Sequence, residues 1–127
     1  MYKYYNPNPG GKIAGDCVIR AISAVLGESW QAVYVDLSVQ GYMMHDWGNS
    51  NGVWGAFLRS HGFERHSLPN TCPDCYTVGD FAEDHRKGRY VLGTGTHAVT
   101  VIDGDVYDSF DSSDMIPIFY YERTDGE

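Results

Sequence analysis

Apolar residues in the N-terminal half of the chain recur at the spacing of helices. The clearest stripe consists of Val18, Ile19, Ala21, Ile22, Val25 and Leu26. This spacing predicts a buried helix, and Asp16 directly before it is a good N-cap residue. Ser29 and Asn51 predict the caps of two further helices, each followed by its own apolar stripe. Residues 1–15 and 40–50 show no period and predict loops.

The pattern changes in the C-terminal half to short runs of β-branched and aromatic residues, which are typical of strands. The expected strands are Phe63–Leu68, Arg89–Leu92, His97–Ile102, Asp105–Phe110 and Ile116–Tyr121. Thr77 and Asp80 form a capping pair that predicts a brief helix ending before Gly88. Helices followed by an antiparallel sheet predict an α+β fold, in one domain spanning residues 1–127. We expect Glu122–Glu127 to be a frayed tail.

Composition and charge exclude several classes of function. The chain has 127 residues, of which 43% are hydrophobic and 14% aromatic, enough for an ordered core. Its net charge is −8 and its basic residues form no cluster, so we expect no nucleic-acid partner. No apolar run approaches the roughly 20 residues of a membrane span and the N-terminus lacks a signal-peptide core. We therefore expect no membrane partner. Three cysteines, an odd number, in a chain without a signal peptide indicate a reducing compartment, so we expect a cytoplasmic protein with free thiols.

Cys17 is the first candidate for chemistry because it lies at the predicted start of the apolar helix. The partial positive charge at a helix N-terminus favours the thiolate, which is the reactive form of cysteine. The unpaired backbone amides there, including that of Cys17, are suited to binding an oxyanion. The alternative is a cysteine that only fills space at the start of a core helix.

A predicted hairpin brings His97 and Asp108 together. The dipeptide Asp103-Gly104 is a strong signal for a two-residue type I′ turn between apolar arms. Pairing outward from this turn makes His97 and Asp108 diagonal neighbours on one face, about 7 Å apart between backbones. A carboxylate on one imidazole nitrogen fixes the tautomer and leaves the other nitrogen for the thiol. A register shift of one residue would move Asp108 to the opposite face.

Cys17, His97 and Asp108 in this order resemble the papain-like cysteine peptidase superfamily, in which a cysteine opens a central helix and His and Asp or Asn lie on successive strands. The segment Gly15–Ser23 is similar to the nucleophile segment of ovarian-tumour-type deubiquitinases. The short His-to-Asp hairpin is similar to that of the NlpC/P60 cell-wall peptidases. In order and size, residues 8–121 resemble small papain-like proteins of phages and mobile elements.

The resemblance implies a papain-like fold, with N-terminal helices, the central one opened by Cys17, packed on a C-terminal antiparallel sheet. It implies a thiol hydrolase, or cysteine protease, that cleaves an amide, peptide or isopeptide bond in a protein or peptide substrate. In this catalytic triad Cys17 is the nucleophile, His97 moves the proton and Asp108 orients His97. No metal and no organic cofactor is implied.

The residue that would hold the oxyanion is less well defined by the resemblance. Papain-type enzymes carry a Gln six residues before the cysteine, and this position is Gly11 here. Asn8, Lys12 or backbone amides alone are the available donors, and Asn8 is our candidate. The segment Met43–Trp47 is expected to border the substrate cleft.

Two other classes of function remain open. A catalytically silent papain-fold protein of a phage or mobile element, binding a host protein, is supported by the missing Gln. A zinc site at Cys72 and Cys75 would need His66 and His85 as further ligands, and an ordinary loop with two thiols is the simpler interpretation. The sequence does not choose among peptidase, isopeptidase, amidase and acyltransferase, and it leaves the oligomeric state open.

Overall fold

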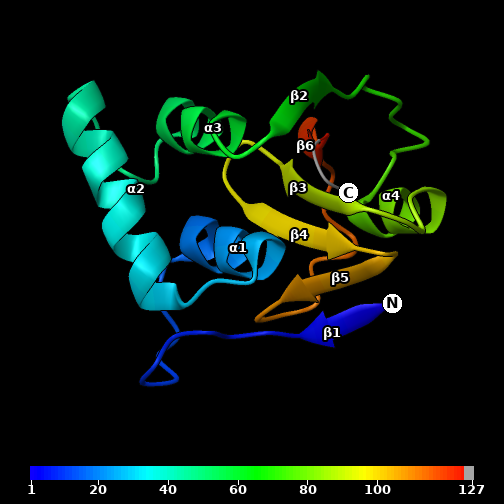
Figure 1. Ribbon diagram of the computed structural model, residues 1–127. Coiled ribbons are helices and arrows are strands. Elements are labelled where there is room, and N and C mark those ends of the chain that lie inside the picture. The colour runs from blue at the N-terminus through cyan, green and yellow to red at the C-terminus, as the bar shows by residue number, and fades with distance from the viewer. Residues whose placement is uncertain (125–127) are drawn as a thin grey trace.

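The fold is known from a computed structural model, in which residues 1–124 are described (Figure 1). Helices in this range are α1 (Cys17–Leu26), α2 (Trp30–Met44), α3 (Asn51–Arg59) and α4 (Val78–Asp84). The strands are β1 (Tyr2–Tyr4), β2 (Phe63–Ser67), β3 (Arg89–Gly93), β4 (Ala98–Ile102), β5 (Asp105–Asp108) and β6 (Phe119–Arg123). They form one sheet in the order β1-β5-β4-β3-β6-β2. The predicted α+β class is confirmed.

The two faces of the sheet carry separate apolar cores. Residues of α1, α2 and α3 pack with Val91 and Ala98 on one face. The other face packs Phe81 of α4 against Leu92 and Val99. Because β3 and β4 contribute alternate residues to the two cores, the sheet is buried on both sides and holds α1 firmly in place.

The predicted apolar helix is confirmed as α1, which begins at Cys17. The predicted cap of the next helix is also confirmed, because the Ser29 hydroxyl accepts a hydrogen bond from the Ala32 amide at 3.1 Å. Two details differ from expectation. The N-cap of α3 is Ser50 instead of Asn51, and the Asp16 side chain makes no capping hydrogen bond to α1.

Two segments expected to be loops contain regular structure. Strand β1 lies within residues 1–15 and pairs with β5 in parallel, so the sheet is mixed and not purely antiparallel. Helix α2 continues to Met44 and takes up part of residues 40–50. Its Gly41 is buried against the returning chain, since an added Cβ would lie 2.6 Å from the Asp46 carbonyl oxygen. The backbone near Asp46 comes so close to α2 that only glycine fits at position 41, and this glycine interrupts the apolar pattern of the helix.

The predicted hairpin has the predicted register, with Ile102 opposite Asp105 and Val101 opposite Val106. Asp103 and Gly104 both have positive φ, 50° and 84°, as a type I′ turn requires. Sequence reasoning therefore placed Asp108 on the correct face.

The ends of several strands differ from prediction. Strand β4 begins at Ala98 and strand β5 ends at Asp108, and the two strands pair with each other from Thr100 opposite Tyr107 to Ile102 opposite Asp105. Strand β6 runs to Arg123, because its pairing with β2 continues to this residue and its pairing with β3 continues to Glu122. The tail prediction is therefore wrong for residues 122 and 123, while residues 125–127 lie outside the described part of the chain.

The expectation of three free thiols is wrong. Cys72 and Cys75 form a disulfide with a Cα–Cα distance of 4.1 Å, and Cys17 keeps a free thiol. A spacing of three residues in an irregular loop lets the two cysteines come this close. No helix in residues 1–124 is both long and apolar enough to cross a bilayer.

Candidate active site

Cys17 lies in the first turn of α1, where it faces a cleft. The cleft has a volume of about 940 Å³ and is lined by residues of α1, α2 and the loops that precede β4 and follow β5, with Cys17 and His97 among them. The thiol is half-buried. Since Asp16 does not cap the helix, the amides of the first turn have no side-chain acceptor among the described residues. The local field therefore favours a thiolate and leaves donors available for an oxyanion.

His97 lies immediately before β4 and is held by Asp108 at the end of β5. Its Nε2 lies 2.7 Å from Asp108 Oδ2, and the two side chains are 10% and 1% exposed. The predicted contact of the two residues is present in the structure. With Nε2 bound to the carboxylate, Nδ1 is left for the thiol of Cys17.

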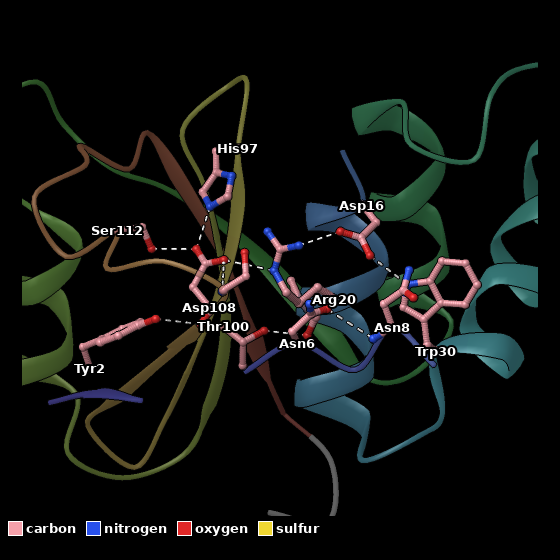
Figure 2. A network of polar contacts seen from close by, with 12 residues as sticks. Tyr2, Asn6, Asn8, Asp16, Arg20, Trp30, His97, Thr100, Asp108 and Ser112 are labelled. Carbon is pink, nitrogen blue, oxygen red and sulfur yellow. Dashed lines mark hydrogen bonds and ion pairs between the residues drawn. The ribbon is translucent and has the colours of Figure 1, made fainter. Parts of the chain in front are cut away.

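Asp108 is a junction for several donors, as Figure 2 shows. Oδ2 also accepts a hydrogen bond from the Ser112 hydroxyl at 2.7 Å. Oδ1 accepts from the Ser109 amide at 2.8 Å and from Arg20 Nε at 3.0 Å. A carboxylate with this many donors is fixed in position and remains ionised.

Arg20 connects Asp108 to the start of the helix that carries Cys17. Its Nη1 donates to Asp16 Oδ1 at 2.6 Å, and its side chain is almost fully buried. Asp16 Oδ2 in turn accepts from Trp30 Nε1 at 2.8 Å. The chain Asp16–Arg20–Asp108 is thus a buried ionic bridge between α1 and β5 (Figure 2), in which each charge has its partner.

The ionisable groups of the site shift one another in the direction of an ion pair. Burial opposes ionisation of the Cys17 thiol, but hydrogen bonding with His97 and the Ala98 amide, together with the charges of His97 and Arg20, lowers its pKa. Burial likewise opposes protonation of His97, yet Asp108 and Cys17 raise its pKa to about 9. Burial would also raise the pKa of Asp108, but hydrogen bonds from His97 and Ser112 lower it. All three shifts are thus in the direction that favours the thiolate, the imidazolium and the carboxylate.

Asn8, the candidate oxyanion donor, lines the cleft together with Cys17. Its side-chain oxygen accepts from the amides of Gly10 at 2.9 Å and Lys12 at 3.3 Å. The turn therefore holds the Asn8 side chain, while its NH₂ group has no hydrogen bond within residues 1–124. Lys12 also lines the cleft.

Aromatic side chains from several elements line the cleft. Trp30, Tyr34, Trp47 and Trp54 line it, and Trp47 is 77% exposed. Of the segment Met43–Trp47, which was expected to border the cleft, only Trp47 does so. A ligand that binds against these rings would cover apolar surface, and Lys12 is an exposed charged residue of the same lining.

The residues considered for zinc are not brought together. Cys72 and Cys75 are joined to each other. His66 lies 3.2 Å from Glu122 Oε1, and His85 stacks on Phe81. In the described part of the chain no three His, Cys, Asp or Glu side chains form a group able to hold a metal ion.

Sequence reasoning did not find Arg20, Ser112 or the role of Asp16. A signal for Arg20 was present, because it is the one charged residue between Cys17 and Leu26 and follows Asp16 by four positions. Such a charge on a core helix implies a buried partner. Ser112 had no comparable signal, since it lies in an irregular segment rich in Asp and Ser.

We compared the chain with protein families, curated proteins and solved structures. No family model, no curated protein and no solved structure matches this chain.

Proposed function

We propose that the protein is a papain-like thiol hydrolase that cleaves an amide, peptide or isopeptide bond. The observation that carries this proposal is the contact of His97 Nε2 with the buried Asp108 carboxylate, beside a half-buried free thiol at a helix N-terminus. A histidine that only satisfied an acid in the core would not need a cysteine next to it. It would also not need a cleft of about 940 Å³ in front of both.

In the proposed reaction the Cys17 thiolate attacks the carbonyl carbon, and the oxyanion is held by first-turn amides of α1 and by Asn8. His97 gives its proton to the leaving amine as the C–N bond breaks, which leaves a thioester on Cys17. His97 then takes a proton from water, whose oxygen attacks the thioester and releases the acid and the thiolate.

The electrostatics support both halves of this cycle. The thiolate is one of the groups that raise the pKa of His97, so acylation of Cys17 removes part of that effect. The pKa of His97 then falls, and the imidazole becomes a base that is available to water. Asp108 stays ionised throughout and keeps the ring in one orientation.

Site-resolved alkylation with iodoacetamide as a function of pH tests the ion pair. The pKa of Cys17 is lowered, so the pH midpoint for alkylation of wild-type Cys17 should lie below that of an ordinary thiol. In His97→Asn the midpoint should rise, because a hydrogen bond and a positive charge are lost. His45→Asn is the matched control, since His45 is exposed and Asn tolerates its φ of 59°.

Acyl transfer is tested with p-nitrophenyl acetate as a generic donor. A hydrolase should give a burst of p-nitrophenol, acetylate Cys17 and then turn over, and His97→Asn should slow the second phase. A thiol that stays inert until the protein unfolds would overturn the enzyme proposal and favour the catalytically silent interaction protein. A Cys17 that acetylates and never turns over would have the same consequence.

A further inference from the structure

The outer face of α2 is apolar and uncovered. Among its side chains Tyr42 is 82% exposed, Val35 57%, Val39 51% and Tyr34 50%. The helix contains one charged residue, Asp36, although the whole chain has a net charge of −8. Exposed apolar surface of this extent on one helix is a sign of a binding surface.

Helix α2 lies at the outer edge of the helical layer, beside α1 and α3 (Figure 1). Its buried residues, Val33, Leu37 and Gly41, provide its packing within the fold. The exposed apolar side chains are therefore not needed for the core, and α2 would be expected to be amphipathic if only stability shaped it.

This face is continuous with the cleft that contains Cys17. A second hollow of about 270 Å³ is lined by Tyr34, Val35, Ser38, Val39 and Tyr42. Tyr34 and Ser38 line the main cleft as well. A ligand that occupies the cleft can therefore pass over these two residues onto the outer face of α2 and into the second hollow.

The dimensions fit a stretch of polypeptide. From Tyr34 to Tyr42 the helix rises about 12 Å at 1.5 Å per residue, a length that about four residues of extended peptide cover. The lining offers no charged group for a phosphate or a carboxylate, so apolar side chains are the complementary chemistry.

We propose that the outer face of α2 binds an apolar segment of the polypeptide substrate, next to the residues that enter the Cys17 cleft. This inference rests on the proposed function and names its substrate class: a protein or peptide with several consecutive apolar residues beside the scissile bond. Tyr34 and Ser38 form the passage between the two parts of the binding surface, and Tyr42 is at its far end.

The test uses two peptides of equal length, each with a central cysteine activated as a thiopyridyl disulfide. The Cys17 thiolate attacks the peptide cysteine sulfur, so a disulfide forms between them. The bond to the thiopyridyl group breaks, and this group leaves as thiopyridone after taking up a proton. One peptide has Leu, Val and Phe on both flanks, and the other has Ser, Thr and Gln.

At about pH 6, below the pKa of an ordinary thiol, the apolar peptide should react about tenfold faster, which corresponds to roughly 1.4 kcal/mol. Tyr42→Ser should remove most of this preference. Tyr4→Ser is the matched control, because Tyr4 on β1 is 69% exposed and lines neither hollow. This control should leave the preference unchanged.

A small reagent separates this inference from the proposed function. Dithiodipyridine reports the Cys17 thiolate alone, so Tyr42→Ser should react with it as the wild type does. If wild-type Cys17 does not react with it at about pH 6, the proposed function fails. If it reacts but the two peptides have equal rates, only the α2 inference is overturned.

Sedimentation of the wild type and Tyr42→Ser detects a second copy of the chain on this face. Loss of a dimer in Tyr42→Ser, with peptide preference retained, would also overturn the inference.

Discussion

At the scale of single residues, Asp108 joins the parts of the candidate site. Arg20 binds one of its carboxylate oxygens and His97 the other. Asp16 balances the charge of Arg20, so that His97 is left to pair with the Cys17 thiolate. One net negative charge remains in this group, at the N-terminus of a helix, where the helix dipole stabilises it.

Arg20→Met should therefore do more harm than the loss of an ordinary arginine. It leaves the buried Asp16 without its cation and takes one of two cations from Asp108, a loss that costs about 3–5 kcal/mol in the free energy of unfolding. The variant should also raise the pH midpoint of Cys17 alkylation, because the charge of Arg20 helps to lower the thiol pKa. Denaturant unfolding and site-resolved alkylation measure the two effects.

Two variants serve as references for this prediction. Arg86 is exposed, so Arg86→Met should change stability by less than about 0.5 kcal/mol. The stability loss of Arg20→Lys should lie between those of Arg86→Met and Arg20→Met, because one ammonium group cannot replace donors at both Nε and Nη1. Equal losses in Arg20→Met and Arg86→Met would show that the buried bridge contributes nothing.

At the scale of elements, the sequence was most informative where structure is determined locally. The apolar stripe after Asp16 and the Asp103-Gly104 turn each depend on neighbours in the chain, and both α1 and the hairpin register were predicted from them. The register also placed His97 and Asp108 together, so this contact of the site was predictable, whereas those of Arg20, Ser112 and Asp16 were not found. Strand β1 was missed because its partner β5 is about one hundred residues away and no local pattern reports it.

Other features were missed because contacts with distant parts of the chain determine the structure there, and not the local sequence pattern. The end of α2 has no amphipathic period, since its outer face stays apolar and Gly41 is needed for a close backbone approach. Asp16 has the sequence position of a cap, but its carboxylate binds Arg20 and Trp30 instead. Competition between a cap and a buried ion pair is decided by tertiary packing, which the sequence pattern does not contain.

The hairpin turn gives a prediction for an element. Gly104 has φ of 84°, and a Cβ there would lie 3.1 Å from Arg86 Cδ. Gly104→Ala should therefore lower the free energy of unfolding by about 1 kcal/mol or more. Gly52→Ala in α3 should have the opposite sign and stabilise by up to about 1 kcal/mol, since its Cβ meets nothing within 4 Å. Denaturant unfolding of both variants measures these changes. Equal changes in the free energy of unfolding for Gly104→Ala and Gly52→Ala would contradict the assigned turn.

At the scale of the whole molecule, the candidate site and the disulfide belong to separate regions. Cys17, His97 and Asp108 lie where α1 meets the β4–β5 hairpin. Cys72 and Cys75 lie in the loop between β2 and α4, and neither lines the cleft. The chemistry of the site should therefore be independent of the redox state of this loop.

The double variant Cys72→Ser, Cys75→Ser tests this independence. The disulfide closes a loop of sequence separation 3, and the chain-entropy model gives roughly 2 kcal/mol for so short a loop. The variant should lose no more than this in the free energy of unfolding, and the pH midpoint of Cys17 alkylation should stay at the wild-type value. Wild-type protein treated with a phosphine reductant should behave in the same way. A shift of the Cys17 midpoint in either sample would mean that the loop acts on the site and would contradict their independence.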